Sequence, residues 1–529
     1  MKNNKYIKWI LSVVGVVLIS SCIPDNLNNN PTASTQMDPN LQIPTVQLLP
    51  SNYADEWHRY FIYPGGFMNQ WTNDWAVIAH GGAGVMNDSY FANMWDEYYP
   101  LVILNVVDLV ERTRDIEEYT NIHAIGLILK VENFLRLTDY YGDIPYFEAG
   151  MAFYSGSLKP AYDKQEDIYM DFFEQLKTAH SLLSESQPRP TSDLYYNGDI
   201  SKWKKYANSL RLRIAMRLVK VKPEIAKAEA EDAVRSGVFT SNADICYVQH
   251  DNVQTVKRES GGNGIANRLL DNAKSSTFRL AKELIGTMET LKDPRIRFYG
   301  GSYLEDAGRP EITDQVFAHY HSYASFALGA QLFSWSQEAN IQGSITIDFN
   351  GESVSVPALL QYLQPSKLIT NPGSPHIRMS YAEVEFLKAD AAQRGYNVGE
   401  SAASLFTKGL EAAVRQWTLF EAKIDEAALT TFINANPLKS GQELEQINTQ
   451  LWVLHFLDPF ETWSNWRRTG LPDIKFYNYH AGNQSDGQTP RRIPYPVSEQ
   501  TSNPEGLKSA VDRMGGKDEW TNRVWWDVK

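Results

Sequence analysis

Apolar residues recur every three to four positions in runs distributed along the chain, which is the spacing of one face of an α-helix. Such runs cover about 100–118, 121–140, 163–183, 200–221, 223–237, 276–291, 380–394, 401–420 and 440–456. Short breaks join many of these runs in pairs, so neighbouring helices should pack antiparallel. The pattern predicts a mostly α-helical fold of stacked helical hairpins of the tetratricopeptide kind, although no repeat matches that consensus well.

Polar residues mark the expected ends of several helices. The spacing of a capping box, a short polar residue followed three positions later by Glu, occurs at Asp163–Glu166, Ser380–Glu383 and Ser440–Glu443. Pro223 suits the first turn of a helix, and Gly395 suits the left-handed residue that ends one. We therefore expect helices to open at these three boxes and at Pro223.

Residues 298–375 interrupt the helical pattern as an irregular, loop-rich insertion. Within it apolar residues alternate with polar ones on both sides of Asn350-Gly351, at Ile345, Ile347, Phe349, Val354 and Val356. Asn-Gly between two alternating runs predicts a small β-hairpin. From Gly470 onward the chain is rich in Pro, Gly and Asn, and we expect this stretch to pack over the core or to carry function.

The first residues read as a targeting segment. Trp9–Ile19 is an apolar run too short to cross roughly 30 Å of hydrocarbon, and lysines precede it. Ile19-Ser20-Ser21-Cys22 resembles a bacterial lipobox, which predicts a signal peptide at 1–21 and acylation of Cys22; an ordinary signal peptide with a chance cysteine is the alternative. Residues 22–50 then read as a tether, and 51–529 as a single helical domain.

Composition and net charge exclude some classes of protein. The 529 residues are 43% hydrophobic and 21% charged, which excludes disorder for most of the chain. The net charge of -13 becomes -16 once the three lysines of residues 1–21 are removed, and such a surface repels nucleic acid. If Cys22 is acylated, Cys246 is the only other cysteine and no intramolecular disulfide can form.

No catalytic signature stands out, and we expect neither an enzyme nor a bound metal or cofactor. The usual zinc-protease, serine-hydrolase, phosphate-loop and calcium-loop motifs do not occur in the sequence. His319-x-His321 is a weak metal pattern on its own. Glu132, Asp139 and Asp143 form an acidic cluster that we interpret as helix caps and as ion-pair partners of Arg136.

Aromatic side chains in loops suggest ligand binding. Trp71, Asn73 and Trp75 lie within five residues in a Gly-rich neighbourhood, and a second cluster in the insertion holds Tyr320, Tyr323 and Trp335. Flat rings cover the apolar faces of a sugar while amides and carboxylates bond its hydroxyls, and peptides can use the same surface. The alternative is that these rings pack the loops onto the helical core.

Five motifs in order along the chain resemble the SusD/RagB family of nutrient-binding outer-membrane lipoproteins, in its SusD-like branch. They are Asp25–Pro31 (DNLNNNP), Thr138–Tyr146 (TDYYGDIPY) with Glu148-Ala149, Tyr381–Gly395 (YAEVEFLKADAAQRG), Glu461–Gly470 (ETWSNWRRTG) and Arg523–Asp527 (RVWWD). Together they span some 500 residues. In these motifs we interpret Gly142, Glu383, Arg467 and Arg468 as residues that specify the fold rather than the ligand.

The resemblance implies a helical fold with four tetratricopeptide-like helix pairs. It also implies an extracellular, lipid-anchored lid that captures oligosaccharide or peptide for a TonB-dependent SusC-like transporter. Ile23-Pro24-Asp25 holds one acid only and matches the acidic surface-export signals of such lipoproteins poorly. Two alternatives stay open: a structural lid of the transporter without ligand affinity, and a surface hydrolase.

Overall fold

The computed structural model describes residues 37–52, 58–73, 76–254, 261–270, 278–301, 344–349, 352–357, 363–474, 476 and 481–529. Helices dominate these residues, which confirms the mostly α-helical class that the hydrophobic pattern predicts. Buried apolar side chains from Val46 to Trp526 form one large contiguous core. The predicted signal peptide and the acylation of Cys22 lie outside the described residues.

The α-helices of the N-terminal half are α2 (Pro39–Leu48), α3 (Asp88–Phe91), α4 (Asn93–Asp96), α5 (Leu104–Thr113), α6 (Thr120–Tyr141), α7 (Ala152–Ser155), α8 (Gln165–Leu182), α9 (Ile200–Arg217), α10 (Pro223–Ser236) and α11 (Gly264–Leu270). Those that follow are α12 (Lys282–Leu291), α13 (Ile296–Tyr299), α15 (Lys367–Thr370), α16 (Tyr381–Gln393), α17 (Ala402–Arg415), α18 (Glu426–Ala435), α19 (Glu443–Leu454), α20 (Pro459–Thr469), α21 (Glu499–Ser502) and α22 (Pro504–Arg513). Short π- or 3₁₀-helical segments are η1 (His58–Gly65), η2 (Val77–Gly81), η3 (Tyr99–Ile103), η4 (Glu117–Tyr119), η5 (Asn242–Asp244), η9 (Gln416–Phe420) and η10 (His455–Leu457).

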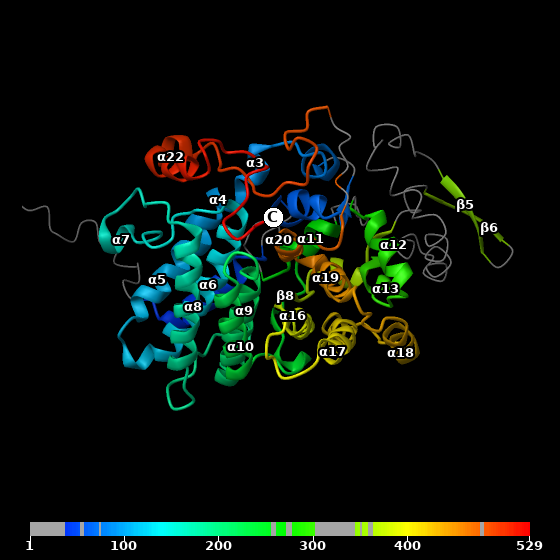
Figure 1. The fold of residues 1–529 in the computed structure, drawn as a ribbon, viewed down its shortest axis with the longest axis horizontal. Coiled ribbons are helices and arrows are strands. Elements are labelled where there is room, and N and C mark those ends of the chain that lie inside the picture. The colour runs from blue at the N-terminus through cyan, green and yellow to red at the C-terminus, as the bar shows by residue number, and fades with distance from the viewer. Residues whose placement is uncertain are drawn as a thin grey trace, which may run out of the picture.

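The long helices pack on one another in chain order. α5 packs on α6, α6 on α8, α8 on α9 and α9 on α10; α16 then packs on α9 and on both α17 and α19. In Figure 1 this series runs from α5 on the left to α17 and α18 on the right. The stack of helical hairpins predicted from the sequence is confirmed.

The strands are short, and several of them contribute side chains to the main core. They are β1 (Trp71–Thr72), β2 (Cys246–Val248), β3 (Arg279–Leu280), β4 (Gly300–Gly301), β5 (Ser344–Phe349), β6 (Glu352–Pro357), β7 (Gln364–Pro365) and β8 (His376–Met379). They form antiparallel pairs β1–β3, β2–β8, β4–β7 and β5–β6. The β5–β6 pair runs in continuous register from Ser344↔Pro357 to Phe349↔Glu352, which confirms the predicted hairpin on either side of Asn350-Gly351.

Of the three predicted capping boxes, one forms in part and two do not form. At α16 the Ser380 hydroxyl accepts the Glu383 backbone N–H at 3.1 Å, but the Glu383 carboxylate does not return to cap; it pairs with Arg213 at 2.6 Å. The other two boxes are wrong. Asp163 instead accepts the backbone N–H groups of Tyr146 and Phe147, both at 2.9 Å, and α19 begins only at Glu443 itself.

The acidic cluster of α6 supports the fold through partners other than those expected. Arg136 pairs with Asp458 at 2.7 Å rather than with its neighbours on α6. Asp139 pairs instead with Arg217 of α9 at 3.2 Å. Asp143 does act as a cap, since its carboxylate accepts the first backbone N–H of α8 at 2.9 Å. Tertiary packing therefore redirects residues that local spacing would pair with one another.

Candidate functional site

Two strand pairs, β1–β3 and β4–β7, lie next to each other and border the two segments in which the sequence predicts ligand-binding aromatic residues. We call these four strands the strand base. β1 pairs with β3 through Trp71↔Leu280, and β4 pairs with β7 through Gly300↔Pro365. The Leu280 N–H then donates to the Leu363 carbonyl at 3.0 Å, which joins β3 to the segment that enters β7. The described residues that border the two segments, Asn73 on one side and Gly301 and Leu363 on the other, therefore belong to or adjoin neighbouring strands.

The Trp71 side chain is buried where the strand base packs on the helical core. Its ring has no exposed surface and stacks on Phe456, with ring centroids 4.2 Å apart and planes at 12°. The indole N–H donates to the Phe456 carbonyl at 2.9 Å. The prediction that Trp71 offers its face to a ligand is therefore corrected: the ring packs the loop onto the core, which is the alternative that the sequence left open.

Asn73 is also buried, with 2% of its surface exposed. Its side-chain oxygen accepts the Val77 backbone N–H at 2.8 Å, so it fixes the start of η2 instead of facing a ligand. Trp75 lies outside the described residues. So do Tyr320, Tyr323 and Trp335, and these four stay predictions.

A groove beside the base offers polar groups that the sequence analysis did not single out. Its volume is about 520 Å³, and it runs between α12 and the segment 472–474. Its lining residues are Lys282, Glu283, Gly286, Thr287, Thr290, Leu291, Trp452, Pro472, Asp473 and Ile474. The Ala281 N–H donates to the Gln70 carbonyl at 3.0 Å, which ties the start of α12 to the Trp71 loop. The groove falls within the 300–1,000 Å³ typical of small-molecule sites.

A sequence signal for this groove existed in the pattern of α12. Leu284, Ile285 and Met288 are buried. Gly286 and Thr290, which are small residues, lie on the opposite side of the helix and line the groove. An added Cβ at Gly286 would meet nothing within 4 Å, so the helix surface is open there. A small, polar face on an amphipathic helix next to an irregular segment marks a shallow surface where a ligand can approach closely.

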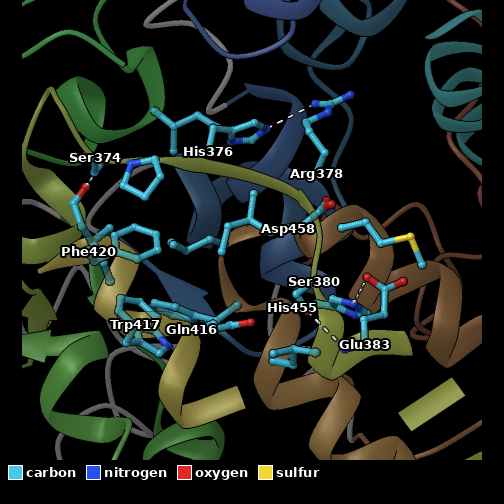
Figure 2. Close-up of a pocket in the computed structure, with 18 of the residues that line it drawn as sticks. Ser374, His376, Arg378, Ser380, Glu383, Gln416, Trp417, Phe420, His455 and Asp458 are labelled. Carbon is cyan, nitrogen blue, oxygen red and sulfur yellow. Dashed lines mark hydrogen bonds and ion pairs between the residues drawn. The ribbon is translucent and has the colours of Figure 1, made fainter. Parts of the chain in front are cut away.

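Figure 2 shows a second, inner cavity between β8, η9 and η10, with a volume of about 60 Å³. Its lining includes the buried side chains of Ser374, His376, Gln416, Trp417, Phe420 and His455. The Gln416 side-chain oxygen and the Trp417 indole N–H have no hydrogen-bond partner among the described residues. A cavity this small, with a few polar groups in a largely apolar wall, has room for a few water molecules and not for a sugar ring.

Burial and neighbouring charges shift the pKa values of two side chains that line the inner cavity, His376 and Glu383. Burial, aided by the nearby Arg378 and Arg136, places the pKa of His376 well below its ordinary value, so its imidazole is neutral. Burial alone would raise the pKa of Glu383, but Arg213 and His455 outweigh it and hold that pKa at about 2. The Glu383 carboxylate is thus a fixed anion inside the stack, with a structural rather than a proton-transfer role.

No group of three or more His, Cys, Asp or Glu side chains in the described residues is arranged to hold a metal ion. His319 and His321 lie outside the described residues. No helix in the described ranges is both long enough and apolar enough to cross a bilayer.

Comparison with known proteins identifies the family. The SusD-like family described as "starch-binding associating with outer membrane" matches residues 67–496, so the chain belongs to this family and the resemblance read from its motifs is confirmed. No curated protein matches.

Solved structures agree over nearly the whole chain. A structure titled as a chitin-binding protein is 33% identical, covers 93% of this chain and 100% of its own, and has a TM-score of 0.77. A Bacteroidetes AC2a SusD-like protein is 28% identical with the same coverages and a TM-score of 0.80. A chitin-binding SusD homologue from Flavobacterium johnsoniae, 24% identical over 92% of this chain and 97% of its own with a TM-score of 0.70, shares the fold.

Proposed function

We propose that the protein is a lipid-anchored nutrient-binding protein of the cell surface, which captures an oligosaccharide and delivers it to a TonB-dependent SusC-like transporter. The observation that carries this proposal is the 33% identity, over 93% of the chain, to a structure titled as a chitin-binding protein. The family description, which names starch binding and the outer membrane, supports the same class of function. Neither comparison is with an enzyme, and we propose capture without hydrolysis.

The geometry offers a place for the ligand. The loop that carries Trp75 and the insertion that carries Tyr320, Tyr323 and Trp335 start from strands joined through Leu280. The groove along α12 begins at the same base and supplies an ammonium, carboxylates and threonine hydroxyls. A sugar chain needs both kinds of group, because aromatic rings cover its apolar faces and polar side chains bond its hydroxyls. We therefore assign Trp75 and the insertion aromatics to the ligand.

Oligomers of β-linked N-acetylglucosamine are the first ligand to test. Isothermal titration calorimetry should compare them with maltooligosaccharides and with mixed peptides on the same preparation. We expect binding to the N-acetylglucosamine oligomers, and Trp75→Ala should weaken it roughly 5- to 150-fold, or about 1–3 kcal/mol. Phe153→Ala, on α7 and far from the strand base, is the matched control and should leave affinity unchanged.

Each other outcome has a definite meaning. Binding of peptides alone would overturn the oligosaccharide assignment in favour of the peptide ligand that the family resemblance also allows. Absence of binding to every compound that the transporter imports would favour a structural lid. Release of shorter products, abolished by one carboxylate substitution, would show a hydrolase and overturn capture without chemistry.

A further inference from the structure

Seven of the twelve large apolar side chains that are exposed in the described residues lie on or next to α2, on α5 and in the segment 147–158 around α7. They are Met37, Leu41, Leu104, Phe147, Phe153, Tyr154 and Leu158. The most exposed are Phe153 at 89% and Leu158 at 83%, so these side chains project from the surface rather than filling a gap in it. We call this set the α7 surface. Projecting apolar side chains in such a group indicate contact with another apolar phase or partner.

Hydrogen bonds hold the three elements of the α7 surface together. The Tyr154 hydroxyl donates to one oxygen of Asp108 on α5 at 2.6 Å. The Gln42 side chain of α2 donates to the other oxygen of Asp108 at 2.9 Å and to the Asn105 carbonyl at 3.0 Å. Leu104 lies one turn before Asp108, on the same side of α5. The projecting side chains are therefore presented from a fixed base.

The loop Ala149–Leu158 within the α7 surface is uncharged, and the charged side chains Asp108 and Arg112 of α5 and Glu148 flank it. Ala149–Leu158 is ten consecutive residues without an acidic or basic side chain, in a chain of which 21% is charged. Aromatic and aliphatic side chains that project from an uncharged loop suit the boundary between lipid headgroups and acyl chains.

The path of the chain points to the same occupant. The described structure begins at Met37, whose carbonyl accepts a hydrogen bond from Arg112 of α5, next to the α7 surface. Only 14 residues separate Met37 from Cys22, and a chain of that length spans at most about 50 Å. An anchor at Cys22 therefore keeps the α7 surface, more than any distant face, close to the bilayer.

We propose that the α7 surface rests on the outer membrane, with Phe153 and Leu158 inserted at the lipid interface. The proposal takes its anchor from the function proposed above. A membrane contact at this face would orient the protein with α7 against the bilayer. The end of the stack at α18, which lies on the opposite side of the molecule in Figure 1, would then point away from the lipid.

The test places a fluorophore sensitive to its environment on single introduced cysteines. Phe153→Cys is the probe, and Thr431→Cys, an exposed site on α18, is the matched control. Cys246 is buried and should not react. The acylated protein is reconstituted in vesicles of phosphatidylcholine and phosphatidylethanolamine, after mass spectrometry confirms acyl chains on Cys22.

At residue 153 we expect emission to shift to the blue and to be quenched by brominated acyl chains, while residue 431 shows neither effect. Adding Leu158→Ser to the labelled protein should roughly halve the quenching. Equal signals at the two sites would overturn the proposal. So would a shift at 153 that appears only with the transporter, or one that depends on protein density, since these mean a protein contact or self-association.

Failure of the anchor is a separate result. If Cys22 carries no acyl chain, the proposed anchoring is wrong, and a protein that also carries Cys22→Ser, so that residue 153 alone is labelled, is then added to preformed vesicles. A blue shift at residue 153 under those conditions still supports membrane contact by the α7 surface. No shift there overturns it.

Discussion

Arg213 should be among the residues on which the stability of this fold depends most. Its guanidinium reaches Glu383 at 2.6 Å and Glu461 at 3.7 Å, and the side chains of all three are at most 4% exposed. Arg213→Met keeps much of the volume but leaves two carboxylates in the interior without this cation. Breaking a buried pair from one side costs about 3–5 kcal/mol, a large part of the 5–15 kcal/mol that stabilises most folded domains.

The matched control is Arg415→Met. Arg415 also makes two charged hydrogen bonds to one carboxylate, that of Glu426, at 2.8 and 2.9 Å. Both of these side chains are well exposed, so water replaces the lost partner and the midpoint of unfolding should hardly move. Urea unfolding followed by circular dichroism compares the two variants. Equal shifts in midpoint would refute the argument that burial decides the cost.

The pH dependence gives a second check on Arg213. The folded pKa of Glu383, about 2, lies below its ordinary value of 4.5, so the stability from its ionised form is complete above pH 4.5 and fades as pH falls toward 2. In Arg213→Met the opposing effect of burial is no longer balanced by this arginine. The loss of stability relative to the natural protein should therefore be largest at neutral pH and smaller at about pH 3; a constant difference would contradict this.

Three further predictions follow from single positions. Trp71→Ala should lower the free energy of unfolding by about 3–5 kcal/mol, because it opens a cavity against Phe456; an unchanged urea midpoint would place the ring outside the core. Gly142→Ala should cost about 1–3 kcal/mol by the same measurement, because Gly142 has φ of +84° while its added Cβ would meet only ordinary contacts; a neutral result would mean that this turn relaxes. Cys22→Ala should abolish acylation and move the protein from the membrane fraction to the supernatant; continued sedimentation with membranes would rule out the cysteine as anchor.

Much of the fold follows from local patterns in the sequence. The α6 helix was expected at 121–140 and runs from Thr120 to Tyr141, because its periodicity is long and uninterrupted. Pro223 opens α10, and Gly395, with φ of +81°, follows the end of α16. These features depend on neighbours in the chain, which the sequence displays directly.

Side-chain roles were harder to predict wherever distant partners compete for them. Glu383 is spaced to cap its own helix, yet its carboxylate pairs with Arg213, 170 residues earlier in the chain. Burial makes a charge-assisted pair worth more than a cap at the surface, and nothing in the local sequence shows which residue will be buried with which. The same competition explains why Asp163 binds the turn at Tyr146 instead of opening α8.

The candidate site could be predicted only in outline. A Trp in a Gly-rich loop has the same appearance whether its ring faces solvent or, like Trp71, stacks on a residue 385 positions away. The groove at α12 is formed by α12, Trp452 of α19 and the segment 472–474, which lie far apart in the chain and share no contiguous motif. The sequence did point to two aromatic-rich segments, and the structure shows that the strands bordering them lie next to each other.

Those strand pairs have a consequence for how ligand preference can change over evolution. The two segments start from two-residue strands, which are held by backbone hydrogen bonds such as that from Leu280 to Leu363, and most residue types can make such bonds. Substitutions, insertions and deletions beyond Gly301 can therefore accumulate without disturbing the buried charges of α9 and α16. A laboratory exchange of residues 302–362 between relatives should accordingly transfer specificity and leave the urea midpoint nearly unchanged.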